Sequence, residues 1–194
     1  CVQNPKCIQP EDEVIKYNMA IIRVTDRLDD LVKQKDLDAS YYRGLIAYER
    51  GKYYVGRATL ITDPDFILSA TVFRRYALDQ FRLAEKNLMI NASSKNPDAC
   101  KYLGEIADLG YVGVKNKDKA TDFYYCAAMS YLDIGKKNAA ADMYNAMRNS
   151  AIHNDPRTIE VYARLHNNES MSNTRKSISQ TSRLDSETSK ISRQ

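Results

Sequence analysis

The sequence has no tryptophan, only two histidines and no long run of apolar residues. A helix that spans a membrane needs about 20 consecutive apolar residues, whereas the apolar runs here are short, as in residues 19–22. The sequence therefore excludes a transmembrane helix. The two histidines, His153 and His166, have no serine or cysteine placed to form a nucleophile–base pair, and we expect both to be solvated.

Motifs of the common enzyme classes are also missing. No phosphate-binding loop, dinucleotide fingerprint or nucleophile elbow occurs, and the cysteines lack the close spacing and the histidine partners of zinc ligands. Carboxylate pairs do occur, at Asp29–Asp30 and at Asp63 and Asp65. We expect the first pair on an exposed helix face and the second in a cap and turn. The sequence thus predicts a protein that is not an enzyme and that binds neither a metal nor a cofactor.

A strong excess of one charge is absent too. Lys and Arg total 29 against 25 Asp and Glu, which gives a net charge of +4, and both signs alternate along the chain. A nucleic-acid-binding protein usually gathers its basic residues on one face, so we expect no nucleic-acid partner. What the chain has in excess is tyrosine, with 14 residues against 4 phenylalanines. Tyrosine suits helix seams and partner-facing surfaces because it joins a large ring to a polar tip.

Apolar residues recur at helical spacing through most of the chain, and no convincing strand-type alternation occurs. The spacing predicts an all-α fold with helices over residues 11–35, 38–51, 72–88, 97–110, 117–134, 138–150 and 156–165. Gly51 is predicted to end the second helix. The chain then divides into a tether over residues 1–10, a helical repeat domain over residues 11–166 and a polar tail over residues 167–194.

Parts of the sequence match each other at fixed offsets. Residues 39–51 (ASYYRGLIAYERG) align with residues 99–111 (ACKYLGEIADLGY) at an offset of 60, and residues 76–86 (YALDQFRLAEK) align with residues 119–129 (KATDFYYCAAM) at an offset of 43. The difference of 17 residues indicates an insertion between the helices of the first unit, near residues 56–72. A weaker third copy covers residues 138–165, and its second helix begins at Asp155. Small residues such as Gly104 and Ala120 are predicted to let paired helices approach closely, with Gly110 and Gly113 in the turn between them.

The clearest copy resembles the SEL-one-like repeat, a relative of the tetratricopeptide repeat. The matching residues are Ala99, Leu103, Gly104, Gly113, Val114, Lys119, Ala120, Tyr124, Ala127 and Ala128. The match is good over residues 99–135, partial over residues 39–88 and faint over residues 138–165, where the Leu-Gly pair is missing. The resemblance implies a short α-solenoid of helical hairpins that serves as a scaffold for proteins or peptides.

Two of the four cysteines lie where they can meet. Cys100 stands at the start of one expected helix and Cys126 near the end of its antiparallel partner. A disulfide between them is geometrically plausible and fits an oxidising compartment; some secreted members of the family that the chain resembles are stapled in this way. The alternative is that both cysteines are buried as small apolar side chains.

The sequence begins with Cys1, followed by a polar stretch that contains Pro5 and Pro10. This start looks like a mature bacterial lipoprotein, in which the thiol of the first cysteine carries a diacylglycerol group. Val2 and Gln3 do not supply the aspartate that resembles an inner-membrane retention signal. We therefore expect lipidation at Cys1 and a place on the periplasmic face of the outer membrane. The alternative is a fragment boundary that happens to fall at a cysteine.

Tyrosines crowd the first helix pair, at Tyr41, Tyr42, Tyr48, Tyr53 and Tyr54. We expect most of them to fill the seams between helices. Those that stay exposed are candidates for contact with a partner, because tyrosine is a favoured contact residue.

The polar tail gives two signals. Its composition, rich in Ser and Thr, predicts disorder. Its apolar residues Met171, Ile178, Leu184 and Ile191 nevertheless follow one another at spacings of seven, six and seven, as in a helix that lies against a partner. The tail is therefore either a segment that folds on another chain or a Ser-rich segment whose spacing is chance.

Taken together, these features predict a non-catalytic protein-binding scaffold, anchored by a lipid and bound to other envelope proteins. We expect it in a larger assembly of the bacterial cell envelope, such as a secretion, conjugation, pilus or motility system. The alternative is a regulatory or inhibitory repeat module that binds a secreted or host protein.

Overall fold

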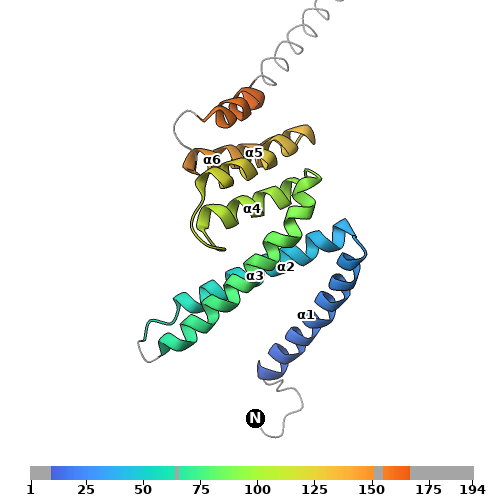
Figure 1. Cartoon of the computed structure of the whole chain (residues 1–194), viewed down its shortest axis with the longest axis vertical. Helices are drawn as coiled ribbons and strands as arrows, with labels where there is room; N and C mark the ends of the chain where they lie inside the picture. Colours follow the sequence, from blue (N-terminus) through green and yellow to red (C-terminus); the bar gives the residue numbers. More distant parts are fainter. Residues whose placement is uncertain (1–9, 64–65, 151–154, 167–194) are drawn as a thin grey trace, which may run out of the picture.

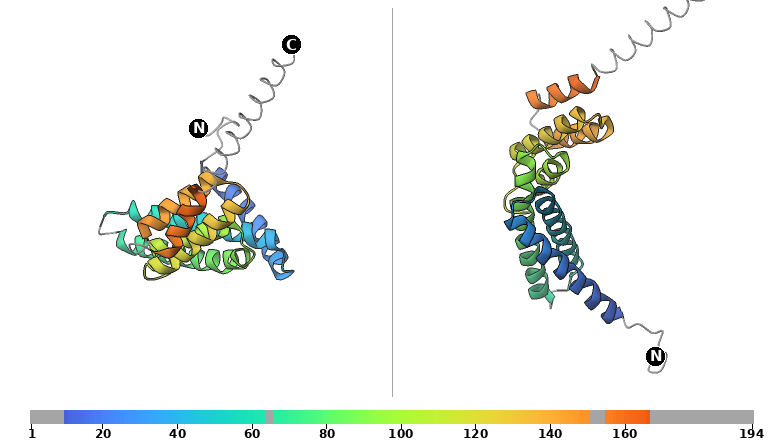
Figure 2. Two further views of the ribbon diagram at one scale, coloured as in Figure 1. Left: turned by 90° about the horizontal axis from the view of Figure 1, so that it is seen from above. Right: turned by 90° about the vertical axis from the view of Figure 1, so that its right-hand side faces the viewer.

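The computed structural model of the chain is all-α, which confirms the fold class predicted from the sequence. It describes residues 10–63, 66–150 and 155–166, with side chains from Met19 onward. The helices are α1 (Pro10–Lys33), α2 (Leu37–Thr59), α3 (Ile67–Ser93), α4 (Pro97–Leu109), α5 (Lys117–Asp133) and α6 (Lys137–Ser150), followed by a seventh helix over residues 156–166. Each of α1 to α5 packs on the next, and the stack follows a curved path (Figures 1 and 2). No strand occurs in the described ranges.

The same turn joins α1 to α2, α3 to α4 and α5 to α6. In each turn one residue adopts a left-handed backbone: Lys35 (φ 64°), Lys95 (φ 59°) and Gly135 (φ 75°). The next N–H then reaches back to a carbonyl of the preceding helix, in the bonds Asp36 to Leu31 (3.1 Å), Asn96 to Asn91 (3.1 Å) and Lys136 to Tyr131 (2.8 Å). These are the hydrogen bonds of a Schellman motif, which ends a helix and satisfies its last carbonyls.

Asp36 and Asn96 then start the following helices. The side chain of Asp36 accepts a hydrogen bond from the N–H of Ala39, and that of Asn96 accepts one from Ala99. Both residues are N-caps, which satisfy N–H groups that a helix cannot bond internally. The two caps are 60 residues apart, which is the offset of the first sequence alignment.

Small residues let the paired helices touch. A Cβ on Gly104 would stand 2.5 Å from the Tyr124 ring. A Cβ on Gly44 would stand 2.7 Å from the Leu88 side chain, and one on Gly51 would stand 2.7 Å from the Phe81 ring. Real Cβ atoms essentially never approach so closely, so each large side chain takes up the space that its glycine leaves. The predicted role of the small residues as helix contacts is confirmed, and Ala107, Ala120, Ala127 and Ala128 are buried as well.

The predicted boundaries of the second and third helices are wrong. Gly51 does not end a helix, because it lies inside α2, where the Phe81 ring requires a residue without a side chain. The inserted residues lengthen both helices instead of breaking the pattern. The helices α2 and α3 have 23 and 27 residues, against 13 and 17 in α4 and α5. In the turn after α4, only Gly110 has the positive φ that was expected of Gly110 or Gly113.

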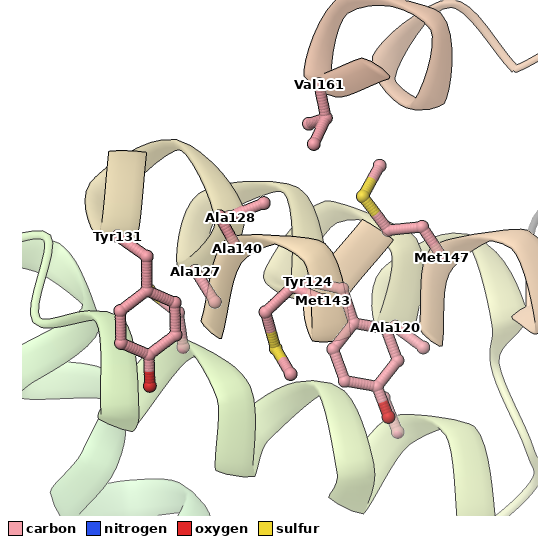
Figure 3. Packing of buried hydrophobic residues seen from close by; sticks show 11 residues of the cluster. Ala120, Tyr124, Ala127, Ala128, Tyr131, Ala140, Met143, Met147 and Val161 are labelled. Atoms are coloured by element: carbon pink, nitrogen blue, oxygen red, sulfur yellow. The ribbon is translucent and has the colours of Figure 1, made fainter. Parts of the chain in front are cut away.

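Two apolar clusters fill the stack. One joins α2, α3 and α4, with Phe81, Leu88 and Leu103 among its fully buried side chains. The other joins α4, α5 and α6 to the seventh helix and is shown in Figure 3. There the Met147 side chain of α6 points toward Val161 of the seventh helix, and both are fully buried.

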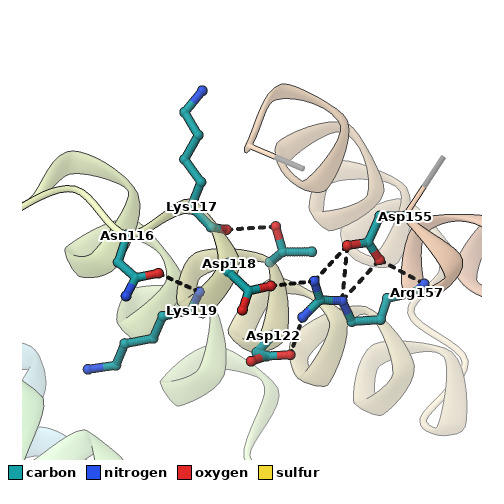
Figure 4. A network of polar contacts seen from close by, with 8 residues as sticks. Asn116, Lys117, Asp118, Lys119, Asp122, Asp155 and Arg157 are labelled. Atoms are coloured by element: carbon teal, nitrogen blue, oxygen red, sulfur yellow. Dashed lines mark hydrogen bonds and ion pairs between the residues drawn. The ribbon is translucent and has the colours of Figure 1, made fainter. Parts of the chain in front are cut away.

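Charged side chains also fasten the seventh helix to α5. The Arg157 guanidinium bonds to Asp118 (2.7 Å), Asp122 and Asp155 (Figure 4). Further along, the Tyr125 hydroxyl donates to Glu160 (2.8 Å) and Arg164 pairs with Asp133 (3.0 Å). Because the contacts advance in the same direction on both helices, the two helices run parallel. The seventh helix thus continues the stack.

The seam predicts opposite effects for two glycine-to-alanine changes. Gly104→Ala places a methyl group against a buried ring, and such overpacking costs about 1–3 kcal/mol. Gly56→Ala is the matched control: Gly56 lies in α2, and a Cβ added there would meet nothing within 4 Å, so alanine should stabilise the helix by about 0.5–1 kcal/mol. Urea unfolding followed by circular dichroism measures both. If the two changes alter the free energy of unfolding equally, close packing at Gly104 is not what stabilises the helix pair.

Candidate functional site

Tyrosines and carboxylates from three helices meet on one side of the stack. We call this group the tyrosine–carboxylate cluster. It consists of Tyr41 and Tyr48 of α2, Asp98, Tyr102 and Glu105 of α4, and Tyr131 of α5. The Tyr48 hydroxyl donates a hydrogen bond to Glu105, and the Tyr131 hydroxyl donates one to Asp98. The Tyr48 and Tyr102 rings lie 4.8 Å apart between centroids. The cluster therefore ties the first helix pair to the second.

Burial and negative charge keep these phenols protonated. Burial, helped by the Asp98 carboxylate, raises the pKa of Tyr41 to about 12. Burial followed by the hydrogen bond to Glu105 raises the pKa of Tyr48 well above its usual value, and the pKa of Tyr131 responds in the same way to burial and Asp98. The pKa of Tyr102 is also raised, by burial first and then by Asp98. All four are neutral hydrogen-bond donors at physiological pH.

The cluster has a buried base and an accessible rim. Tyr48 and Tyr131 are only 2% and 4% exposed, whereas Tyr41, Asp98, Tyr102 and Glu105 are half-buried. Tyr42, which is 54% exposed, extends the rim, because its ring meets that of Tyr41 edge-on at 5.4 Å. Two ammonium groups lie over the rings, Lys101 over Tyr102 (5.6 Å) and Lys52 over Tyr48 (5.3 Å). The rim thus offers flat rings beside charged groups of both signs, which is typical of protein contact surfaces.

The structure brings together only some of the tyrosines predicted as partner contacts. Tyr41 and Tyr48 lie in the cluster, although Tyr48 is a core residue. Tyr53 and Tyr54 lie further along α2 in a separate aromatic group, where Tyr54 contacts Phe73 and Tyr76. Cys1, the predicted lipidation site, and the tail residues predicted as partner contacts, Met171, Ile178, Leu184 and Ile191, lie outside the described residues.

The carboxylates of the cluster were missed by sequence reasoning. Asp98 and Glu105 read as ordinary surface positions on a helix, and their hydroxyl partners are 33 and 57 residues away along the chain. A weak signal existed, because Tyr102 and Tyr42 are equivalent in the repeat alignment. That equivalence places a tyrosine at the same height on α2 and α4, but it says nothing about which carboxylate faces it.

The structure joins Cys100 and Cys126 as a disulfide, with their Cα atoms 6.0 Å apart. Cys100 lies in the first turn of α4, and Cys126 lies in the second half of α5. The bond therefore fastens these two helices two residues from Asp98, beside the cluster. The alternative of two unbonded apolar side chains is not the arrangement that the structure shows.

The other candidate sites hold no catalytic arrangement among the residues described. Asp29, expected on an exposed face, accepts a hydrogen bond from the largely buried Arg43 at 2.6 Å and so links α1 to α2. A shallow pocket of about 260 Å³ lies at the turn after α4, where Lys119 and Glu85 pair at 2.7 Å across its edge. Within the described ranges, no group of three His, Cys, Asp or Glu residues is placed to hold a metal ion.

No family model, curated protein or solved structure matches the chain. The resemblance to SEL-one-like repeats therefore stays a prediction from the sequence. Among the helices that the structure describes, none is long and apolar enough to cross a membrane.

The raised tyrosine pKa values predict a loss of stability in alkali. Below about pH 10, folded and unfolded chains keep the phenol proton, so these groups contribute no pH dependence. Above it, the unfolded chain loses protons that the folded chain retains, and the free energy of unfolding falls as pH rises. Tyr131→Phe should reduce this slope by up to about 1.4 kcal/mol per pH unit.

Urea midpoints between about pH 8 and pH 11 measure the slope. Tyr162→Phe, on the exposed side of the seventh helix, is the control and should leave the slope as it is. An identical slope in native protein and Tyr131→Phe contradicts the account.

Proposed function

We propose that the protein is a non-catalytic scaffold whose tyrosine–carboxylate cluster binds a segment of a partner protein. The observation that carries this proposal is the rim of the cluster, where Tyr41 and Tyr42 of α2 and Tyr102 of α4 stay accessible. Tyrosine dominates contact surfaces because it presents much area while losing little conformational freedom.

The rim is held in place before a partner arrives. The Tyr48 and Tyr131 hydroxyls bond to Glu105 and Asp98, and the disulfide fixes α4 against α5 next to them. A rigid surface binds more tightly than a flexible one, because ordering side chains on association costs about 0.5–1.5 kcal/mol for each immobilised side chain. The stack therefore supports binding by supplying a preorganised face.

The charge of the rim favours a basic partner segment. Burial raises the pKa of the Tyr102 phenol most, and the carboxylates Asp98, Glu105 and Glu49 raise it further, so three acidic groups lie near this ring. A lysine or arginine of the partner can meet these carboxylates and stack on the accessible rings. Lys52 and Lys101 lie at the edge of this surface, where they repel a basic side chain and so direct it toward the carboxylates.

The disulfide supports a place outside the reducing cytosol, since structural disulfides persist mainly in oxidising compartments. A periplasmic scaffold in a cell-envelope assembly is consistent with this bond, and we retain that setting as part of the proposal. Lipidation at Cys1 remains a prediction from the sequence, and mass spectrometry of the native N-terminus tests it.

The proposal is tested by site-specific photo-cross-linking in the native host. A photoreactive residue in place of Tyr42 should trap one discrete partner, and the same residue in place of Tyr162 on the seventh helix should not. With that partner purified, Tyr42→Ala combined with Tyr102→Ala should weaken binding at least tenfold, because two contact rings are lost.

Two controls keep this test specific. Tyr162→Ala removes a ring of similar exposure and should leave the affinity unchanged. The double variant must retain cooperative unfolding, so that a loss of binding is not a loss of fold. If the purified partner binds the double variant and the native chain equally, the rim is not the binding surface.

A further inference from the structure

The α2–α3 hairpin ends in large apolar side chains that face solvent. Figures 1 and 2 show this end projecting away from α4 and α5. We call residues 52–63 and 66–76 the hairpin tip. The exposed apolar residues near its end are Leu60 (75%), Phe66 (58%), Ile67 (60%), Leu68 (77%) and Val72 (42%). Monomeric proteins rarely leave so many neighbouring apolar side chains open to water unless the patch binds something.

The core of the tip is made of small residues. Ala58, Ala70 and Ala77 are 3%, 4% and 3% exposed and close the seam between the two helices. At the tip the fully buried residues are therefore small and the large apolar residues near its end are exposed, the reverse of the usual arrangement, whereas the half-buried rings of Tyr54 and Phe73 pack on each other. Because alanines already fill the seam, the exposed apolar residues of the tip contribute little to the stability of the hairpin. Their side chains are therefore available to contact a partner molecule or a lipid surface.

The side chains of the tip lie in layers along the hairpin axis. The contacts of Gly44 with Leu88 and Gly51 with Phe81 fix the register of the two helices, and this register sets Leu60 level with Val72 and Arg57 level with Arg75. With a rise of 1.5 Å per residue, the five apolar residues lie within roughly 9 Å of the end of the hairpin. The arginines follow at roughly 12–14 Å from the end.

The layer of arginines gives the tip a positive charge. Between residues 52 and 76 the sequence has four basic residues, Lys52, Arg57, Arg74 and Arg75, against the two acidic residues Asp63 and Asp65. Arg57 lies over the Phe73 ring at 5.8 Å, and the half-exposed Tyr76 ring follows in the next layer. Arginine and tyrosine are the residues that favour the boundary between lipid and water.

We propose that the hairpin tip inserts into the headgroup region of a bilayer that contains anionic lipids. Interfacial segments bury their apolar side chains about 5–10 Å into this boundary, which is the depth of the apolar layer. At that depth the arginines reach the level of the lipid phosphates, where the negative surface potential attracts basic residues. The apolar and arginine layers share no residue with the tyrosine–carboxylate cluster, whose members on α2 are Tyr41 and Tyr48, and Lys52 lies between the two surfaces.

The shape of the tip favours lipid over a protein partner. Its exposed apolar residues are Leu60, directly after α2, Phe66, directly before α3, and three residues of the first turns of α3, so they come from both sides of the hairpin instead of from one helix face. A fluid bilayer surrounds such a convex end without a matching pocket. At the connection of the shorter α4–α5 hairpin, Leu109 is 46% exposed and Val114 is 93% exposed, and Val114 is the control position because it is the more exposed of the two.

A single tryptophan reports insertion, because the chain has none of its own. The full chain carries Cys1→Ser, so that no acyl chain can attach there, together with Phe66→Trp or Val114→Trp. With vesicles of phosphatidylglycerol and phosphatidylcholine, the Phe66→Trp emission should shift to the blue and be quenched by brominated acyl chains. Val114→Trp emission should not change. Phe66→Trp emission that stays unchanged with these vesicles overturns the proposal.

Vesicle co-sedimentation gives an independent measurement. Ile67→Asp combined with Leu68→Asp should lower the vesicle-bound fraction at least tenfold, and Arg74→Glu combined with Arg75→Glu should lower it similarly at low salt. The control Val114→Asp should bind as the native chain does. Equal binding of the Ile67 and Leu68 variant and the native chain overturns the proposal. The proposal is also overturned if the native chain does not bind anionic vesicles but binds a purified envelope protein through the hairpin tip.

Discussion

The stack depends on close approach between paired helices at glycine positions. Gly44, Gly51 and Gly104 each face a large side chain that takes up the volume a Cβ needs. Dispersion forces fall off steeply with distance, so a ring held against bare backbone contributes more than one held away by a methyl group. The position of α2 against α3 and of α4 against α5, and with it the side chains on their outer faces, follows from these contacts.

The surface features follow from the same seams. Because α4 lies close to α5, Asp98 comes within hydrogen-bonding distance of Tyr131, and the Cα atoms of Cys100 and Cys126 come to 6.0 Å. Because α2 and α3 are each ten residues longer than α4 and α5, their hairpin extends past the stack and exposes its apolar end. A preorganised tyrosine face and a projecting apolar tip are thus two consequences of one packing rule.

Local signals in the sequence were sufficient for the all-α fold and for the bounds of the clearest pair, α4 and α5, but not for the lengths of α2 and α3. The caps at Asp36 and Asn96 and the small residues of α4 and α5 act as their residue types predict.

The register of α2 against α3 could not be predicted in the same way. The alignment makes Gly44 equivalent to Gly104 and Phe81 equivalent to Tyr124, yet Phe81 packs on Gly51, seven residues further along α2. A shift of two helical turns presents the same face of the helix, so periodicity cannot distinguish the two registers. The tyrosine–carboxylate pairs join α4 to α2 and to α5, so they depend on how these helices are placed against one another and were not predictable from one sequence.

A double-mutant cycle between positions 104 and 124 tests the packing rule most directly. Gly104→Ala, Tyr124→Ala and the double variant are compared by urea unfolding under the same conditions. If the ring and the missing Cβ compete for one space, Gly104→Ala should destabilise the native chain but not the Tyr124→Ala background. The coupling free energy should then be about 1 kcal/mol or more. Effects of the two changes that add within about 0.5 kcal/mol contradict the account.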